Sequence, residues 1–330
     1  MAEDLRRLTR TDVFELMAIA VLAPVAWGLP ERRAWWPISR GLSRAIANLW
    51  PATTADRRAR LRSALGDHAA EIDLDALRVD VMATYMEERL EILRAYRPGG
   101  WRPRLTVEGR AHLEAAAATG RGVVLWVAPF SYADLVTKIA LSEAGVAVSH
   151  LGAFSRGFSP NSCYTWTRSR FGMKVLSPLR TRVEDRHLRE RIVMPLDGGL
   201  GYMRVVEQRL RAAGVVSIRA GDVGQRALEL PFLAGTIRLA TGPASLALST
   251  GAALHPVCCI RNGSGDFTIT IEPELRASAG RPRRDATDDL VRAYAARLEA
   301  WVLRQPYMWS GWYQMPPWSL GTGEDARLAG

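Results

Sequence analysis

The stretch Gly122–Asp134, which reads GVVLWVAPFSYAD, most constrains what this 330-residue chain can fold into. Mostly apolar residues with β-branched valines among them run into Pro129, and a short turn leads to Asp134 and an apolar helical pattern over Leu135–Leu141. This order predicts a buried strand, a sharp loop and a helix that begins near Asp134. Because open α/β sheets bind ligands at the loops leaving the carboxyl ends of strands, Asp134 is a candidate site residue. The same position also suits a structural helix N-cap.

The chain after Pro98-Gly99-Gly100 alternates between strand and helix patterns, which predicts an α/β domain over residues 101–330 with a mixed, mainly parallel sheet flanked by helices. Besides the opening strand, the expected strands are Thr106–Glu108, Val146–Leu151, Lys174–Ser177, Val215–Arg219, Leu228–Leu233, Leu254–Ile260 and Phe267–Ile271. The expected helices include Ala111–Thr119, Glu184–Arg191, Tyr202–Ala213, Thr241–Thr250 and Asp285–Arg304.

Residues 1–100 form a second region, which is predicted to be all-helical. Its apolar stretch Asp12–Leu29 is interrupted by Pro24, and its continuous part is shorter than the ~20 residues that span a bilayer. It also lacks the small-residue cleavage site of a signal peptide. Arginines and tryptophans at its flanks favour a helix that lies in a membrane surface. A buried core helix is the alternative.

The net charge of +10 is concentrated in one segment, because residues 155–226 hold 14 Arg and Lys against 6 Asp and Glu. This excess favours anionic partners such as cofactor phosphates, an acidic carrier protein or lipid headgroups, with a solvated surface as the alternative. The basic residues are not interleaved with aromatics, so nucleic acid is not an expected partner. The three cysteines, Cys163, Cys258 and Cys259, are too few and too poorly spaced for a disulfide framework or a zinc site, and a cytoplasmic setting is expected.

Four blocks in sequence order resemble the lysophospholipid acyltransferase superfamily, in the branch of late lipid A (lauroyl and myristoyl) and mannoside acyltransferases. They are GVVLWVAPFSYAD, VVSIRAGDVGQRALELPFLAG, TGPASLALSTGAALHPV and QPYMWSGWYQMPPW. The resemblance covers nearly the whole length. It implies a glycerol-3-phosphate-acyltransferase-like fold and acyl transfer from an acyl-CoA or acyl-carrier-protein thioester to a lipid, glycolipid or other polar acceptor. It also implies no bound cofactor or metal, and work at an anionic membrane surface on the cytoplasmic face of the inner or plasma membrane.

The family's His-x4-Asp/Glu motif is altered in this chain. In the family, the histidine takes the acceptor's proton while the carboxylate orients the imidazole. The residue five positions before Asp134 is Pro129, which has no titratable group. One interpretation is an active enzyme that uses an amine acceptor or a base elsewhere. A catalytically inactive acyl- or lipid-binding relative or partner subunit is the second. The third interpretation is a lipid-A-type acyltransferase whose motif is misaligned here. It is the weakest of the three, because no other histidine is followed five residues later by a carboxylate in a suitable loop.

The candidate residues follow from these blocks. Asp134, Ser131, Tyr132 and His150 are the candidate catalytic residues, His150 because it lies at the carboxyl end of an expected strand. Donor or acceptor binding is expected at Arg156 and Asn161, in the loop after that strand, and at Arg219 and Asp222, on the turn where the family often has an acidic residue. A surface ion pair is the alternative for each of these four.

Overall fold

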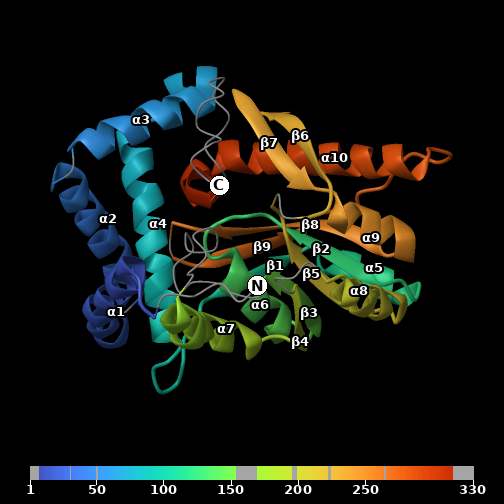
Figure 1. Cartoon of the computed structure of the whole chain (residues 1–330), viewed down its shortest axis with the longest axis horizontal. Helices are drawn as coiled ribbons and strands as arrows, with labels where there is room; N and C mark the ends of the chain where they lie inside the picture. Colours follow the sequence, from blue (N-terminus) through green and yellow to red (C-terminus); the bar gives the residue numbers. More distant parts are fainter. Residues whose placement is uncertain are drawn as a thin grey trace.

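A computed structural model describes residues 7–29, 31–49, 51–153, 169–194, 199–221, 224–263 and 265–314. Three of the candidate binding residues, Arg156, Asn161 and Asp222, therefore lie outside the described residues. The molecule is a seven-stranded sheet covered by helices, with a group of N-terminal helices against one end and a separate two-stranded hairpin (Figure 1).

The sheet has the strand order β1-β9-β8-β2-β5-β3-β4. Five neighbouring strands, β8, β2, β5, β3 and β4, are parallel, whereas β9 is antiparallel to β8 and β1 is parallel to β9. Their bounds are β1 Leu105–Glu108, β2 Val123–Val127, β3 Val148–Ala153, β4 Glu190–Met194, β5 Val215–Arg219, β8 Ala253–Arg261 and β9 Phe267–Ile271. The expected mixed, mainly parallel sheet is confirmed, and the opening stretch supplies β2 near its centre.

Helices cover both faces of this sheet. They are α5 Arg110–Ala118, α6 Ala133–Glu143, α7 Ser177–Asp185, α8 Gly201–Arg211, α9 Gly242–Thr250 and α10 Arg283–Arg304. Because side chains alternate along a strand, β2 serves both faces. Trp126 stacks on Tyr294 of α10 with ring centroids 3.9 Å apart, while Val127 faces α6. Helices α8, α9 and α10 therefore share one face and α6 lies on the other.

The N-terminal region is helical, as expected: α1 Arg10–Gly28, α2 Glu31–Leu49, α3 Pro51–Leu65, the short 3-10 turn η1 Gly66–Ala70 and α4 Leu74–Arg94. Both α1 and α2 pack along α4. A buried ion pair joins Glu15 to Arg89 over 3.2 Å. Trp35 and Leu90 belong to the same buried cluster as Trp126, so the apolar core continues from these helices into the sheet. The proposed boundary near residue 100 stays a prediction.

The first helix buries one side and exposes the other. Leu22 and Ala26 are buried, whereas Val13, Met17 and Val21 are exposed. In the part of the chain that the structure describes, no helix has the length and apolar character needed to cross a membrane. The membrane-associating role of this segment is not confirmed and stays a prediction.

Two predictions of secondary structure in the segment before and at β4 were wrong. Lys174–Ser177 is not a strand, because Gly172–Leu176 forms a π-helical turn (η3) that continues into α7, where Pro178 suits the first helical turn. Glu184–Arg191 is not a helix, since α7 ends at Asp185 and β4 begins at Glu190. Strand β4 lies at the sheet edge and has a single buried residue, Ile192, so its sequence carries little apolar signal.

A third prediction was wrong about pairing. The strand expected at Leu228–Leu233 exists as β6, Ala227–Phe232, but it pairs only with β7, Gly235–Ala240, and not with the main sheet. This hairpin buries Leu230 and Phe232 and contacts α10. The chain then closes with a 3-10 turn, η4 Pro306–Met308, and the short helix α11 Gly311–Gln314.

Candidate active site

The loop after β2 is held in place by the end of the chain. The Ser131 N–H donates to the Met308 carbonyl at 2.7 Å, and the Ser310 N–H donates to the Pro129 carbonyl at 2.9 Å. An isolated β-bridge between Phe130 and Trp309 lies between these two bonds. We call Met308–Ser310 the C-terminal strap. It fixes the backbone of the loop that contains Pro129 and Ser131.

Tyr132 turns the chain from the loop into α6. Its backbone is left-handed, with φ of 69°, a conformation that non-glycine residues rarely adopt. Its buried hydroxyl donates to Glu87 of α4 at 2.6 Å, and Glu87 also accepts from Arg261 at 3.0 Å. Burial, together with the negative Glu87, raises the pKa of Tyr132 well above its ordinary value. The Tyr132 hydroxyl therefore links the loop after β2 to α4 through a buried hydrogen bond.

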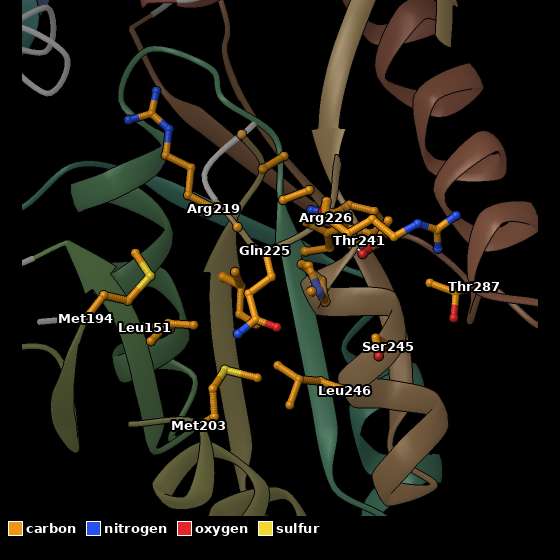
Figure 2. A pocket seen from close by; sticks show the side chains of 18 of the residues that line it. Leu151, Met194, Met203, Arg219, Gln225, Arg226, Thr241, Ser245, Leu246 and Thr287 are labelled. Carbon is orange, nitrogen blue, oxygen red and sulfur yellow. Dashed lines mark hydrogen bonds between the residues drawn. The ribbon is translucent and has the colours of Figure 1, made fainter. Parts of the chain in front are cut away.

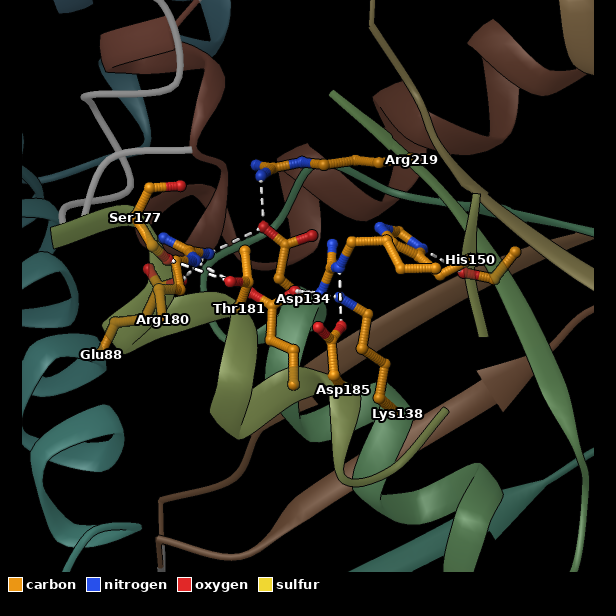
Figure 3. Close-up of polar contacts among 12 residues, drawn as sticks. Glu88, Asp134, Lys138, His150, Ser177, Arg180, Thr181, Asp185 and Arg219 are labelled. Atoms are coloured by element: carbon orange, nitrogen blue, oxygen red, sulfur yellow. Dashed lines mark hydrogen bonds and ion pairs between the residues drawn. The ribbon is translucent and has the colours of Figure 1, made fainter. Parts of the chain in front are cut away.

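Asp134 is bound by two arginines from different elements (Figure 3). Its Oδ2 accepts from Arg219 of β5 at 2.6 Å and from Arg180 of α7 at 2.9 Å. The side chain is only 4% exposed. The N-cap alternative is wrong, because Tyr132 occupies the N-cap position and no side chain caps this helix. The carboxylate instead anchors two guanidinium groups, which stabilise its charged form.

Asp134 belongs to a larger cluster, which we call the buried charge network. Arg180, 1% exposed, also donates to Glu184 at 2.9 Å and to Glu88 at 3.4 Å. Glu184 in turn accepts from Lys138 at 2.5 Å and from Arg191 at 2.8 Å. Burial raises the pKa of Glu88, and the positive Arg180 opposes that rise. The network contains the carboxylates of Glu88, Asp134 and Glu184 and the cations Arg180, Arg219, Lys138 and Arg191.

His150 lies on the same face of the sheet as Asp134. Its Nδ1 is 2.9 Å from the Ser217 Oγ of the neighbouring strand, and its side chain is buried. His150 and Ser217 line a small void next to α6, and Asp134 and Lys138 of that helix line it too. The prediction that His150 lies at the carboxyl end of its strand is wrong, because β3 extends to Ala153 and His150 lies in its middle. The same small void nevertheless brings His150 close to Asp134 of α6.

A cavity of about 1000 Å³ lies on the opposite face, between α8 and α9 and at the carboxyl ends of β2 and β5 (Figure 2). This volume is at the upper end of the range for ligand pockets. Pro129, Arg219 and Ser310 line its edge, whereas Asp134 and His150 are not among its lining residues. Arg219 thus connects the two faces: one nitrogen binds Asp134 and the other donates to the Ser310 Oγ at 2.7 Å.

The cavity wall is divided by chemistry. Leu151, Met194, Leu200 and Met203 form an apolar side next to β3, β4 and α8. Arg226, Arg283 and Arg284 lie on the other side, where α9 and α10 begin. A molecule with an apolar chain and an anionic group matches this arrangement.

Several of these residues could not be recognised as site residues from the sequence. Arg180 and Glu88 are distant in sequence from Asp134, and charged residues on helices ordinarily indicate a solvated face. Ser310 lies within the Trp-rich block, which was a signal for the block but not for the residue. Among the residues described, no group of His, Cys, Asp or Glu is arranged to hold a metal ion. Burial raises the pKa of both Cys258 and Cys259, so neither thiol is an activated nucleophile.

Comparisons with known proteins match this chain to acyltransferases. The family described as "Bacterial lipid A biosynthesis acyltransferase" matches residues 6–314. A "Phosphatidylinositol mannoside acyltransferase" from Mycolicibacterium smegmatis is 28% identical over 309 residues, which cover 91% of this chain and 90% of that protein. A protein of the same description from Mycobacterium tuberculosis is 27% identical over 225 residues, covering 68% of this chain and 62% of its own.

Solved structures also match this chain, and one of them is an acyltransferase. The 1-acyl-sn-glycerophosphate (LPA) acyltransferase PlsC from Thermotoga maritima matches 80% of this chain and 97% of its own length, with 12% identity and a TM-score of 0.31.

Proposed function

Because the chain belongs to the bacterial lipid A biosynthesis acyltransferase family, we propose that it moves an acyl group from a CoA or carrier-protein thioester to a polar lipid, in the cavity beside Pro129. The chain is an acyltransferase by family. The donor, the acceptor and the altered motif are the parts that we propose. Since the relatives are described as phosphatidylinositol mannoside acyltransferases, a glycolipid is the first acceptor class to test.

The observation that carries the proposal is the position of the cavity. Its lining includes Pro129 of the loop after β2, Arg219 at the end of β5 and Ser310 of the C-terminal strap. Its apolar side provides a place for an acyl chain, because burying each CH₂ group contributes about 0.8 kcal/mol. Its volume accommodates more than the chain alone, so the thioester and part of the donor arm also fit within it.

The reaction needs a charge-stabilising group at the edge of this cavity. The acceptor's oxygen or nitrogen attacks the thioester carbonyl, the C–S bond breaks, and the acceptor's proton ends on the sulfur of the released thiol. Arg219 is the cation at the cavity edge, where it would stabilise the negative oxygen that develops during attack. Asp134 and Ser310 fix the Arg219 guanidinium from two directions. We therefore assign Asp134 as a positioning residue for Arg219.

The lack of a titratable group at Pro129 is expected to lower the reaction rate. A positioned general base contributes about 10²- to 10⁴-fold to rate. A proline offers none, so a hydroxyl acceptor is expected to react that much more slowly than in a relative with the motif histidine. An amine acceptor reacts as its free base and avoids this loss. The comparison of hydroxyl and amine acceptors therefore tests the altered motif directly.

The defining experiment incubates the purified protein with labelled acyl-CoA or acyl-carrier protein and with glycolipid, lipid A precursor and amine acceptors. We expect acylated product from at least one acceptor, and a loss of at least tenfold in kcat/KM for Asp134→Asn and Arg219→Gln. Arg110→Gln is the matched control, since Arg110 forms an exposed ion pair with Glu114 on the surface of α5. If donor analogues bind but no acceptor is acylated, the protein is an acyl-binding relative.

The membrane part of the proposal rests on exposed apolar side chains in α1 and α2. Val13, Met17 and Val21 on α1 are exposed, as are Leu42 and Leu49 on α2. Helix α2 is amphipathic, and α1 is apolar on most of its sides. Exposed apolar side chains on such helices bind at the interface of anionic bilayers, which would place the site at the cytoplasmic face of the inner or plasma membrane.

Anionic liposomes test this surface directly. We expect Met17→Asp to lower co-sedimentation with them, while Val205→Asp, a matched change at an exposed valine on α8, leaves it unchanged. Equal binding by all three proteins would remove the membrane surface from the proposal.

A further inference from the structure

The two ends of the cavity differ in charge. Leu151 and Met203 lie on the apolar side, and Arg226 lies on the far side beside Thr287 (Figure 2). Among the described residues, the lining includes four arginines, namely Arg219, Arg226, Arg283 and Arg284, and one carboxylate, Glu207. Three of these arginines, Arg226, Arg283 and Arg284, lie near the starts of α9 and α10. The reaction proposed above gives them no role.

The start of α9 opens into this basic end. Thr241, Gly242 and Pro243 line the cavity, and Thr241 is the N-cap but makes no capping side-chain bond. A Cβ built on Gly242 would meet no atom within 4 Å, so the space in front of this turn is open. The first N–H groups of a helix lack partners within the helix and favour anions.

The arginines at the start of α10 are available to a ligand. Arg226 is paired with Asp288 at 2.6 Å. Arg283 donates only to the Ser245 carbonyl, at 3.4 Å, and Arg284 has no ion pair or hydrogen bond with any residue in the described ranges. Two adjacent arginines in the first turn of a helix are unfavourable against its macrodipole, even beside Asp285. A bound anion would offset that cost.

We propose that Arg283 and Arg284, with the start of α9, bind the phosphate ester of the acyl donor's phosphopantetheine arm. This inference rests on the proposed function, because it places the donor's acyl chain on the apolar side of the same cavity. Guanidinium groups bind phosphate oxygens through paired charge-assisted hydrogen bonds. A donor carries both groups on one molecule, so it can occupy both sides of a single cavity. The phosphate is common to coenzyme A and to the carrier protein's prosthetic group.

The test measures binding of non-hydrolysable S-hexadecyl thioethers to the full chain by calorimetry, which requires no turnover. The probes are S-hexadecyl-pantetheine, S-hexadecyl-phosphopantetheine and S-hexadecyl-CoA. We expect the wild type to bind the phosphorylated arm at least tenfold more tightly than the unphosphorylated one. Arg283→Gln/Arg284→Gln should abolish this preference and leave the affinity for S-hexadecyl-pantetheine unchanged. Arg292→Gln, an exposed arginine of α10 outside the cavity lining, should retain the preference.

Each other outcome overturns the inference. Equal wild-type affinity for the two pantetheine probes, or a preference that persists in the double variant, means that these arginines do not bind the arm's phosphate. Competition by adenosine 3′,5′-bisphosphate alone would assign them to the nucleotide, and competition by inositol phosphate alone would assign them to an acceptor headgroup. Phosphate-dependent binding without any acylated product would refute the proposed function and leave the subsite standing, whereas turnover without phosphate dependence would do the reverse.

Discussion

Replacing Arg180 by methionine is the sharpest test of how the site is held together. The Arg180 guanidinium is 1% exposed and lies within 3.4 Å of Asp134, Glu184 and Glu88. Removing it takes away the cation that is paired with the buried Glu88. Asp134 and Glu184 each lose one of their paired cations and retain the others. Breaking a buried pair in this way costs about 3–5 kcal/mol. Since domains have about 5–15 kcal/mol of stability, the variant should remain folded but unfold at much lower denaturant.

The destabilisation should depend on pH with a defined sign. Burial already raises the pKa of Glu88, and Arg180 opposes this rise, so its removal raises that pKa further. A carboxyl group whose folded-state pKa is raised contributes stability below its unfolded pKa and loses it as the pH rises through the folded value. The free-energy deficit of Arg180→Met should therefore be smaller at pH 5 than at pH 8.

The assay is urea unfolding at both pH values, followed by circular dichroism. Arg110→Met serves as the control, because exposed pairs such as Arg110–Glu114 contribute about 0.5 kcal/mol or less. Arg180→Met/Glu88→Gln should recover part of the loss, since the second change neutralises the stranded carboxylate. A deficit below about 1 kcal/mol for Arg180→Met, equal at both pH values, would refute the view that this arginine compensates a buried charge cluster.

Three further predictions concern the loop, the strap and the sheet. Pro129→His should raise kcat for a hydroxyl acceptor by less than tenfold in steady-state assays, because Asp134 is already engaged by two arginines and is not available to orient the imidazole. Ser310→Ala should lower kcat more than it changes donor KM, since it frees one side of Arg219; equal kinetics would contradict that role. Burial lowers the pKa of His255, so its stability contribution is present above the unfolded-state pKa of about 6.5 and is lost as the pH falls from there through the lower folded-state pKa. His255→Gln should therefore weaken the pH dependence of the unfolding free energy between pH 7 and 5.5.

Part of the basic excess in residues 155–226 has an internal explanation. Arg180 and Arg191 belong to the buried charge network, and Arg209 binds Glu190 at 2.6 Å. These arginines hold α7, α8 and β4 together rather than meeting an external anion. Of the four arginines that line the cavity, Arg219 and Arg226 belong to that segment, whereas Arg283 and Arg284 come from outside it. Net charge along the sequence therefore indicated only part of the basic chemistry of the cavity.

The sequence by itself determined the main elements of the fold. The apolar run before Pro129 gives the central strand β2, and the repeating apolar positions of residues 285–304 give α10, because strands and helices leave different periodicities in the chain. It also predicted the position of Asp134 just after β2, where α6 begins. These features depend on neighbours within a few residues, which the sequence displays directly.

Only the tertiary structure decided what surrounds the loop after β2. In the folded chain Asp134 accepts hydrogen bonds from Arg180 and Arg219, and the Tyr132 hydroxyl donates to Glu87 of α4. The cavity lies on the face of the sheet opposite Asp134. The tertiary structure also separated β6 from the main sheet and made β4 an edge strand. The physical reason is that ion pairs and cavities depend on distances through space between elements from remote parts of the chain, and local periodicity contains no information about those distances.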